Sequence, residues 1–474
     1  MLGRFMSEYS MSSNAKASTT LGREHIAVNR FGYGARGDEL QQAKSNPLQW
    51  VIGQLQPVSF NEKLPNSHDV FIAHAKFVKQ KKQRKMQAKK ASSSQVSRQS
   101  KAQVKAVKSY GRNALFELSA DTLNQAITSP YSVSWRLLDF FSNHFSVSTT
   151  GVLMTGLSAT LEREAIAPHL LGDFAEMLLA VEQHPAMLIY LNNEKSFGPN
   201  SRMAKKRKVG LNENLAREIM ELHTLGVNGG YTQTDVVELA KAITGWSVKH
   251  PKRDKGTGFI FRPYGHEPGT RTLLGKAYPQ KKISQGEQML RDLAMHPSTA
   301  KYVCQKIAQH FVGDNVPDTL IAKMQNTWLE NNGNIKEVMV TLFSAEEAWL
   351  NEPQKFKTPR EFVISTYRAL GPKQVKNKML FYSLDNLGQK PFNAGSPAGY
   401  SDDKSHWLGA SALMARIEWS SLLSEQFPRL SSEKIMTTAL GESMSQNTYQ
   451  LVMRAESRQQ SRTLFLMSPE FQRR

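Results

Sequence analysis

A helical spacing of apolar residues recurs along most of this chain and constrains its fold more than any other feature. Apolar side chains return about every three to four residues, which is the period of an amphipathic helix. Gly226, Gly245 and Gly371 each follow such a stretch directly, where helices commonly end. The spacing predicts helices at residues 213–225, 233–244, 285–295, 297–312, 319–331, 335–344, 359–370, 404–424 and 446–457. The sequence therefore predicts a mainly α protein.

The stretch around residues 259–278 breaks this helical pattern. FIFRPY and RTLLGKAY are short and strand-like, and they flank the loop GHEPGT. We expect these two segments to pair as a small β-hairpin inserted among the helices. No internal repeat is visible. The expected organisation is a flexible N-terminus over residues 1–22, followed by one large helical domain over residues 23–474.

A basic, low-complexity insertion is expected within this domain at residues 76–112. It holds 13 of the 61 Lys and Arg residues of a chain with a formal net charge of +20, and no acidic residue lies between Val70 and Phe116. Because like charges repel and little apolar surface is present, the insertion is expected to be a solvated helix or disordered. The functional alternative is a contact for an acidic partner, anionic lipid or nucleic acid.

Nucleic acid fits this insertion poorly. No aromatic residue on which bases could stack occurs between Phe77 and Tyr110. The chain also lacks a helix-turn-helix, zinc-finger or RNA-recognition signature.

The segment GLNENLAREIMELHTLGVNGGYTQTDVVELAKAITGW holds the densest set of functional side chains. Projected as a helix, Asn214, Arg217, Glu218 and Glu221 share one arc, and His223 lies in the middle of the apolar arc. This arrangement predicts a catalytic site. Glu218 and Glu221 would act as base or metal ligands, Arg217 would orient them or hold an anionic group, and His223 would carry protons.

The two glutamates also have a purely structural interpretation. Glu218 and Glu221 are i,i+3 neighbours and repel each other unless something compensates. Arg217 can pair with Glu221 and with Glu213, which would form an ordinary salt-bridge ladder. A bound divalent cation or a shared proton would be the catalytic form of compensation. For His223, the structural alternative is a hydrogen-bonded core histidine.

The residues around this helix complete the candidate site. Asn212, Asn214, Tyr231 and Asp235 are the predicted substrate-binding residues. Asp235 also fits a capping box with Thr232, in the spacing typical of a helix start.

His266 is a further catalytic candidate. It lies beside Glu267 in the loop between the proposed strands, where we expect it to be exposed and available as a proton carrier.

Several common site classes are excluded. Cys304 is the only cysteine, so the chain has neither an internal disulfide nor a cysteine-based metal cage. A nucleophile elbow, a P-loop, a dinucleotide fingerprint and an HExxH zinc motif are all missing. No apolar run reaches the roughly 18 residues that a membrane span needs. The start MLGRFMSEYSMSSNAKAS lacks the apolar stretch of a secretory signal, so a cytoplasmic location is the default expectation.

The block NENLAREIMELHTLGVNGGYTQTDVVELAKAITGW resembles the hallmark block of the bacterial domain-of-unknown-function family 1800. The resemblance covers nearly all of the chain, through NRFGYG, FFSNHFSV, AVEQHPAMLIYLNNEKSFGPNS, the loop His266 followed by LLG, HPSTAKYVCQKIAQHFV, FKTPREFVIS and residues 399–416. It implies a large helical protein of a family that has no established reaction and is often exported. This sequence differs from that pattern in lacking an obvious export signal and in carrying the basic insertion.

Members of this family are frequently encoded beside proteins that look like sulfatases and alkaline phosphatases. That association implies a functional link to such a neighbour and the processing of sulfated, phosphorylated or glycan material. The first hypothesis is therefore a hydrolase or lyase that acts on an anionic substrate through a Glu/Arg/His site. The alternative is a non-enzymatic binding or assembly protein that captures an acidic partner through its basic insertion.

Overall fold

The computed structural model describes residues 21–90, 98–206, 209–249, 254–350 and 355–474, and it is mainly α-helical, as the sequence predicts. Of the N-terminal segment 1–22, residues 1–20 lie outside the described residues. Helix α18 (Pro359–Leu370) shows how closely local signals set the bounds of an element. It begins at a capping box formed by Thr358 and Glu361, and it ends at Gly371 with a left-handed φ of 69°.

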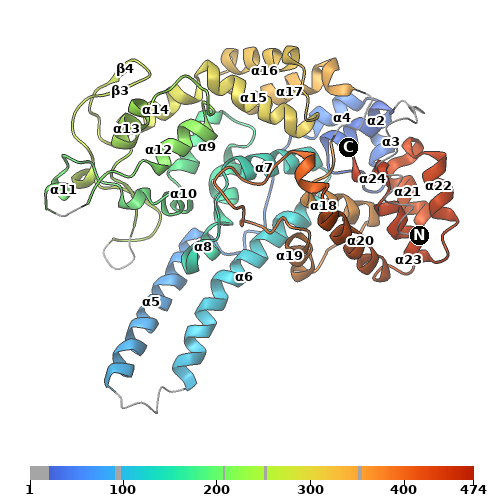
Figure 1. Ribbon diagram of the computed structural model, residues 1–474, viewed down its shortest axis with the longest axis horizontal. Coiled ribbons are helices and arrows are strands. Elements are labelled where there is room, and N and C mark those ends of the chain that lie inside the picture. Colours follow the sequence, from blue (N-terminus) through green and yellow to red (C-terminus); the bar gives the residue numbers. More distant parts are fainter. Residues whose placement is uncertain (1–20, 91–97, 207–208, 250–253, 351–354) are drawn as a thin grey trace.

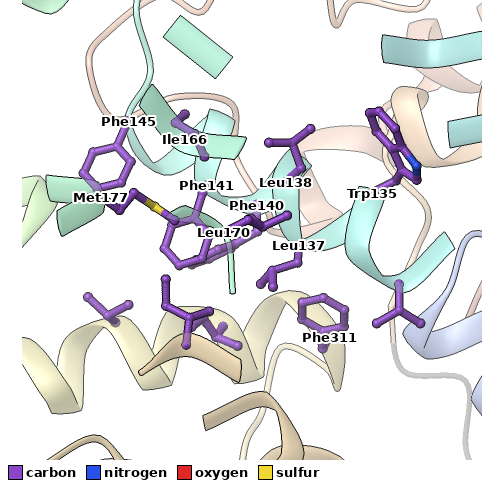
Figure 2. Packing of buried hydrophobic residues seen from close by; sticks show 14 of the residues in the cluster. Trp135, Leu137, Leu138, Phe140, Phe141, Phe145, Ile166, Leu170, Met177 and Phe311 are labelled. Atoms are coloured by element: carbon purple, nitrogen blue, oxygen red, sulfur yellow. The ribbon is translucent and has the colours of Figure 1, made fainter. Parts of the chain in front are cut away.

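A central helix, α7 (Ser132–His144), organises the core. Ten of the thirteen residues of its sequence SVSWRLLDFFSNH are buried, and they include the polar Ser132, Ser134 and Arg136 as well as all of its apolar residues. Figure 2 shows Leu137, Phe140 and Phe141 of this helix packed beside Phe311 of a neighbouring helix. One continuous hydrophobic core contains buried residues from Ile26 to Phe471, so the N-terminal and C-terminal helices pack into the same body.

The remaining helices surround α7 (Figure 1). Before it come α2 (Arg23–His25), the π-helical η1 (Ile26–Phe31), α3 (Glu39–Lys44) and α4 (Pro47–Gly53). After it come α8 (Gly151–Leu157), the π-helical η2 (Glu162–Ile166), η3 (Ala167–His169), α9 (Phe174–Glu182), α10 (Pro185–Tyr190), η4 (Asn193–Lys195), α11 (Arg202–Lys206), α12 (Asn214–Glu218), the π-helical η5 (Ile219–His223) and α13 (Gln233–Ala242).

The C-terminal half continues with α14 (Ile283–Ala294), α15 (Pro297–Phe311), α16 (Asp318–Glu330), α17 (Ile335–Ser344) and α18, and then α19 (Asn377–Asn386), α20 (Ala410–Glu425), α21 (Ser432–Leu440), α22 (Gln446–Met453), α23 (Arg458–Leu466) and α24 (Pro469–Gln472). Short 3₁₀ turns are η6 (Pro263–Gly265), η7 (Glu346–Trp349), η8 (Lys404–Trp407) and η9 (Gly441–Ser443).

The basic insertion belongs to two long helices that project from the body as an antiparallel arm (Figure 1). These are α5 (Ser67–Lys90) and α6 (Arg98–Thr128). Near the body, buried Val70 and Phe71 of α5 and Ala114 of α6 join the main core. Residues 91–97 of the predicted insertion lie outside the described residues.

The strand pairing differs from the prediction. Both predicted segments contain strands, but they do not pair with each other. Instead β2 (Phe259–Phe261) pairs with β1 (Trp246–Val248), and β3 (Arg271–Leu273) pairs with β4 (Lys276–Tyr278), both antiparallel. The cause is the dipeptide Leu274-Gly275, whose φ angles of 48° and 78° form a tight turn that folds RTLLGKAY back on itself.

Among the described helices, none combines the length and the apolarity that crossing a membrane requires.

Candidate functional site

Glu218 and Glu221 lie on one helical stretch whose geometry changes between them. α12 is a regular helix, and η5 continues it as a π-helical turn. The stretch is anchored by the fully buried side chains of Leu215, Ala216, Ile219 and Met220. Single π-helical turns occur frequently at functional sites. The stretch is thus fixed on its apolar side, while its carboxylates face a less buried environment.

Three tyrosines lie near enough to the two carboxylates for the charge of Glu218 or Glu221 to act on them, and we call the five side chains the carboxylate–tyrosine site. Tyr190 ends α10, Tyr231 precedes α13, and Tyr302 lies on α15; all five side chains are half-buried. Burial raises the pKa of each tyrosine, and the charge of Glu218 or Glu221 raises it further. Segments from distant parts of the chain therefore bring aromatic rings to the predicted pair of glutamates.

The two carboxylates are not used by the fold. Within the described part of the chain, neither Glu218 nor Glu221 accepts a hydrogen bond or forms an ion pair. Burial raises the pKa of Glu218 above its ordinary value, and the charge of Glu221 raises it further, although His223 and Arg217 act in the opposite direction. The protonated form of Glu218 is thus favoured relative to a free glutamate. Both groups remain available to a ligand.

Arg217 is engaged elsewhere. Its guanidinium group lies 3.2 Å from the carboxylate of Glu213 and donates a 2.9 Å hydrogen bond to Gln233. The Glu213 half of the predicted ladder is thus present. No ion pair joins Arg217 to Glu221 among the described residues. Arg217 is therefore partly neutralised by another partner.

The predicted substrate-binding residues fall into two groups. Tyr231 joins the carboxylate–tyrosine site. Asn212 accepts a hydrogen bond from the backbone of Asn214 at 2.9 Å, so it shapes the start of α12, whereas the side chain of Asn214 is exposed. Asp235 forms the predicted capping box with Thr232 and also accepts a bond from the backbone of Leu274 at 2.8 Å. Asn212 and Asp235 therefore hold the local backbone.

His266 is buried, so the expectation of an exposed loop histidine is wrong. Its Nδ1 lies 3.0 Å from the carbonyl oxygen of Thr244. The neighbouring Glu267 is also buried, and it accepts hydrogen bonds from the backbone and side-chain nitrogens of Asn200 at 2.8 and 2.6 Å. Burial lowers the pKa of His266, which favours its neutral form. The structure does not bring His266 to the carboxylate–tyrosine site.

His223 is buried beneath η5, in a pair with a second buried residue. Its Nδ1 lies 2.7 Å from Oε1 of Glu182 on α9, and both side chains are 0% exposed. The other two polar atoms, His223 Nε2 and Glu182 Oε2, have no partner among the described residues. The pair ties η5 to α9 and fixes the turn that carries Glu221.

His144, at the end of α7, links this pair to a buried lysine. Its Nε2 lies 3.1 Å from the carbonyl oxygen of His223, and its Nδ1 lies 3.3 Å from Nζ of Lys306. Burial and the charge of Lys306 hold the pKa of His144 well below its ordinary value. The neutral ring therefore donates through Nε2 and accepts through Nδ1.

A second polar centre, which the sequence interpretation missed, surrounds a cavity of ≈ 60 Å³ beside α7. We call it the His310 cavity; it is lined by Asp139, Ser142, Asn143, Ser146, Val147, His310, Thr358, Arg360, Gln389, Lys390, Pro391, Phe392, Ala394, Tyr400, Ser401 and Asp402. Nδ1 of His310 lies 3.3 Å from Oδ1 of Asp402, and its Nε2 has no partner among the described residues. Burial lowers the pKa of His310 to about 4.

The two centres lie along one stretch of chain, residues 142–148. Ser142, Ser146 and Val147 line the His310 cavity. Ser148 donates to the carbonyl oxygen of Ala394 at 2.7 Å, and it lies near enough to Tyr190 of the carboxylate–tyrosine site to lower the pKa of that tyrosine. The sequence did contain a signal for the cavity, because FFSNHFSV, the end of HPSTAKYVCQKIAQHFV, FKTPREFVIS and residues 399–416 all contribute to its wall.

A metal centre is not apparent in the described residues. They contain no group of three or more His, Cys, Asp or Glu side chains placed to hold a metal ion.

Comparison with known proteins gives one match. The family model "Protein of unknown function (DUF1800)" matches residues 26–473, which is nearly the whole chain. No curated protein and no solved structure matches significantly.

Proposed function

This chain belongs to the DUF1800 family, and we propose that it is a hydrolase that cleaves glycans at the carboxylate–tyrosine site. The observation that carries this proposal is the pair Glu218 and Glu221, two half-buried carboxylates with which no described residue forms a hydrogen bond or an ion pair. Paired carboxylates next to a bound sugar are the usual catalytic groups of glycoside hydrolysis.

The environment of the two glutamates favours different roles. Burial raises the pKa of Glu218, which suits it to be the general acid. Glu218 would donate a proton to the glycosidic oxygen as the bond between that oxygen and the anomeric carbon breaks. Glu221 would remove a proton from a water molecule, whose oxygen bonds to the anomeric carbon. His223 and Glu182 would position η5 without touching the substrate.

The three tyrosines and the two glutamate charges favour a sugar ring over a sulfated or phosphorylated group as the substrate. Tyr190, Tyr231 and Tyr302 combine apolar ring faces with hydroxyl groups, as a sugar ring requires. A sulfated or phosphorylated group would be repelled by Glu218 and Glu221 unless a cation offset them, and Arg217 is already paired with Glu213. Hydrolysis also fits better than the lyase alternative. Elimination usually needs an acidic group on the substrate, and Glu218 and Glu221 would repel such a group.

The test is the release of new reducing ends from neutral oligosaccharides and polysaccharides. Glu218→Gln and Glu221→Gln should each reduce activity on the order of 10²–10⁴-fold. Glu213→Gln is the matched control, since it removes a nearby carboxylate that pairs with Arg217, and it should retain activity. Full activity of Glu221→Gln on an identified substrate would refute the proposal.

A second candidate function, capture of an acidic partner, is favoured by the arm. Lys76, Lys79, Lys81, Lys82 and Lys85 are exposed on α5, away from the core. We propose, as the alternative function, that this basic face binds an acidic protein. Polyglutamate binding should be lost on deletion of residues 76–112 and should weaken as salt rises. Binding that is unchanged in either experiment would refute this alternative.

A further inference from the structure

We propose that Lys306 of α15 is a positioning residue for the carboxylate–tyrosine site. It acts through His144 and Tyr302 on η5, the π-helical turn that carries Glu221. The inference rests on the proposed function for the reaction that this geometry serves. The contacts that carry it, however, lie within the protein and do not depend on which substrate binds.

A charged side chain is unfavourable at the position of Lys306. The side chain is partly buried, and burial lowers the pKa of its ammonium group. The charge of Asp402 acts in the opposite direction, but within the described part of the chain no acidic group forms an ion pair with Lys306. An apolar side chain of similar length, such as methionine, would avoid this desolvation. Packing alone therefore does not account for a lysine here.

The first contact of Lys306 fixes the protonation of His144. Nζ of Lys306 lies 3.3 Å from Nδ1 of His144. Because an ammonium group can only donate, Nδ1 carries a lone pair and the proton of the neutral ring is on Nε2. Nε2 lies 3.1 Å from the carbonyl oxygen of His223 and donates to it. Lys306 thus sets the hydrogen bond that holds the last residue of η5.

The second contact of Lys306 is with Tyr302, one helical turn earlier on α15. The ammonium group lies 5.5 Å from the centre of the tyrosine ring, within the range of a cation–π interaction. The ring approaches Gly226 so closely that a Cβ added there would lie 2.8 Å from Cδ2 of the tyrosine. The amide nitrogen of Gly226 in turn donates to the carbonyl oxygen of Met220 at 3.1 Å. The ring therefore packs against the residue that closes the turn.

The two contacts converge on the segment that holds Glu221. The rings of His144 and Tyr302 lie 6.4 Å apart, so one lysine reaches both. Glu221 lies between Met220 and His223, whose carbonyl groups are the two points held, and its charge raises the pKa of Tyr302. A displacement of about 1 Å at a catalytic group can lower a rate about 10²-fold. We therefore expect the effect of this lysine on catalysis to exceed its effect on stability.

The first test is nitrogen NMR of the imidazole rings in the full chain, with the signals of His144 assigned through His144→Gln. We expect the neutral ring to be protonated at Nε2. Lys306→Met should move the Nδ1 signal towards that of an unbonded nitrogen, and the amide signals of Glu221 and Thr224 should move with it. Lys301→Met, which removes an exposed lysine from the same helix, is the matched control and should move none of them.

A proton on Nδ1 of His144 in the wild type would overturn the inference. Unmoved signals of Glu221 and Thr224 in Lys306→Met would do the same. The fold of this variant is checked by circular dichroism, and if it does not fold, the protonation of His144 in the wild type decides.

The second test separates this inference from the proposed function. On a glycan that the wild type cleaves, Lys306→Met should lower kcat about 10²-fold and change KM by less than about twofold, because the groups that meet the substrate are all retained. Lys306→Arg keeps a charged donor and should recover most of the activity. Wild-type kcat in Lys306→Met would refute the positioning role alone. Absence of glycan cleavage by the wild type, with the signals of η5 moved in Lys306→Met, would refute the proposed function alone.

Discussion

Glu361 and the pair Glu218/Glu221 show two opposite ways in which this protein uses a carboxylate. Glu361 is buried on α18, where it pairs with Arg136 at 2.9 Å and Arg474 at 2.7 Å. Burial would raise its pKa, but these two arginines lower it to about 2. Glu218 has no such partner, and its pKa is raised. A paired carboxylate holds helices together, whereas an unpaired one adds nothing to the fold and is free for chemistry.

The largest effect on stability is expected for Glu361→Gln. The substitution leaves two buried arginines without a compensating charge, so unfolding should become easier by about 3–5 kcal/mol. Urea denaturation measures this difference. The matched control is Glu213→Gln, which breaks the half-exposed pair with Arg217 and should cost no more than about 1 kcal/mol. Equal costs for the two variants would show that Glu361 holds the fold together no more than Glu213 does.

The second prediction concerns pH. Burial lowers the pKa of His310 from 6.5 to about 4, so the folded state prefers the neutral ring. The contribution of the neutral ring to folding stability is fully present above pH 6.5, which is the pKa of the histidine in the unfolded chain. It is lost as the pH falls towards 4, and the loss of stability is about 3 kcal/mol. His310→Gln should remove this part of the acid destabilisation, measured as unfolding free energy at pH 7 and pH 4.5. The control is His68→Gln, which replaces an exposed histidine and should keep the acid destabilisation. An unchanged pH dependence of the unfolding free energy in His310→Gln would contradict the prediction.

The sequence predicts what depends on neighbours along the chain. Helix α18 appears at its predicted bounds, and the capping box at Thr232 is confirmed, because a cap needs only residues about three positions apart. The i,i+3 placement of Glu218 and Glu221 is predictable for the same reason.

The His310 cavity could not be predicted in this way. His310 and Asp402 are separated by 92 residues, and Arg136 and Glu361 by 225. Nothing in local spacing selects such partners from the many acidic and basic residues of the chain. The burial of His266 was missed for a related reason, since Thr244 holds it through a contact that the loop sequence does not encode.

A smaller effect is expected at Gly226, which ends the turn that carries Glu221. Its φ is 83°, and an added Cβ would lie 2.8 Å from Cδ2 of Tyr302. Gly226→Ala should cost about 1–2 kcal/mol and displace the tyrosine. Gly388→Ala is the control, because its φ of 88° is similar but nothing lies within 4 Å of the added Cβ. An equal cost at both positions would mean that Tyr302 is not held tightly against the turn.

The smallest effect on stability is expected where the effect on activity should be largest. Glu218→Gln and Glu221→Gln remove like charges at i,i+3, and no described residue loses an ion pair. Unfolding free energy should therefore stay the same or rise by up to about 1 kcal/mol. A loss of several kcal/mol would place Glu221 with Glu361, as a structural carboxylate. Unchanged stability together with lost glycan cleavage would show that the fold tolerates this repulsion because the reaction needs both groups.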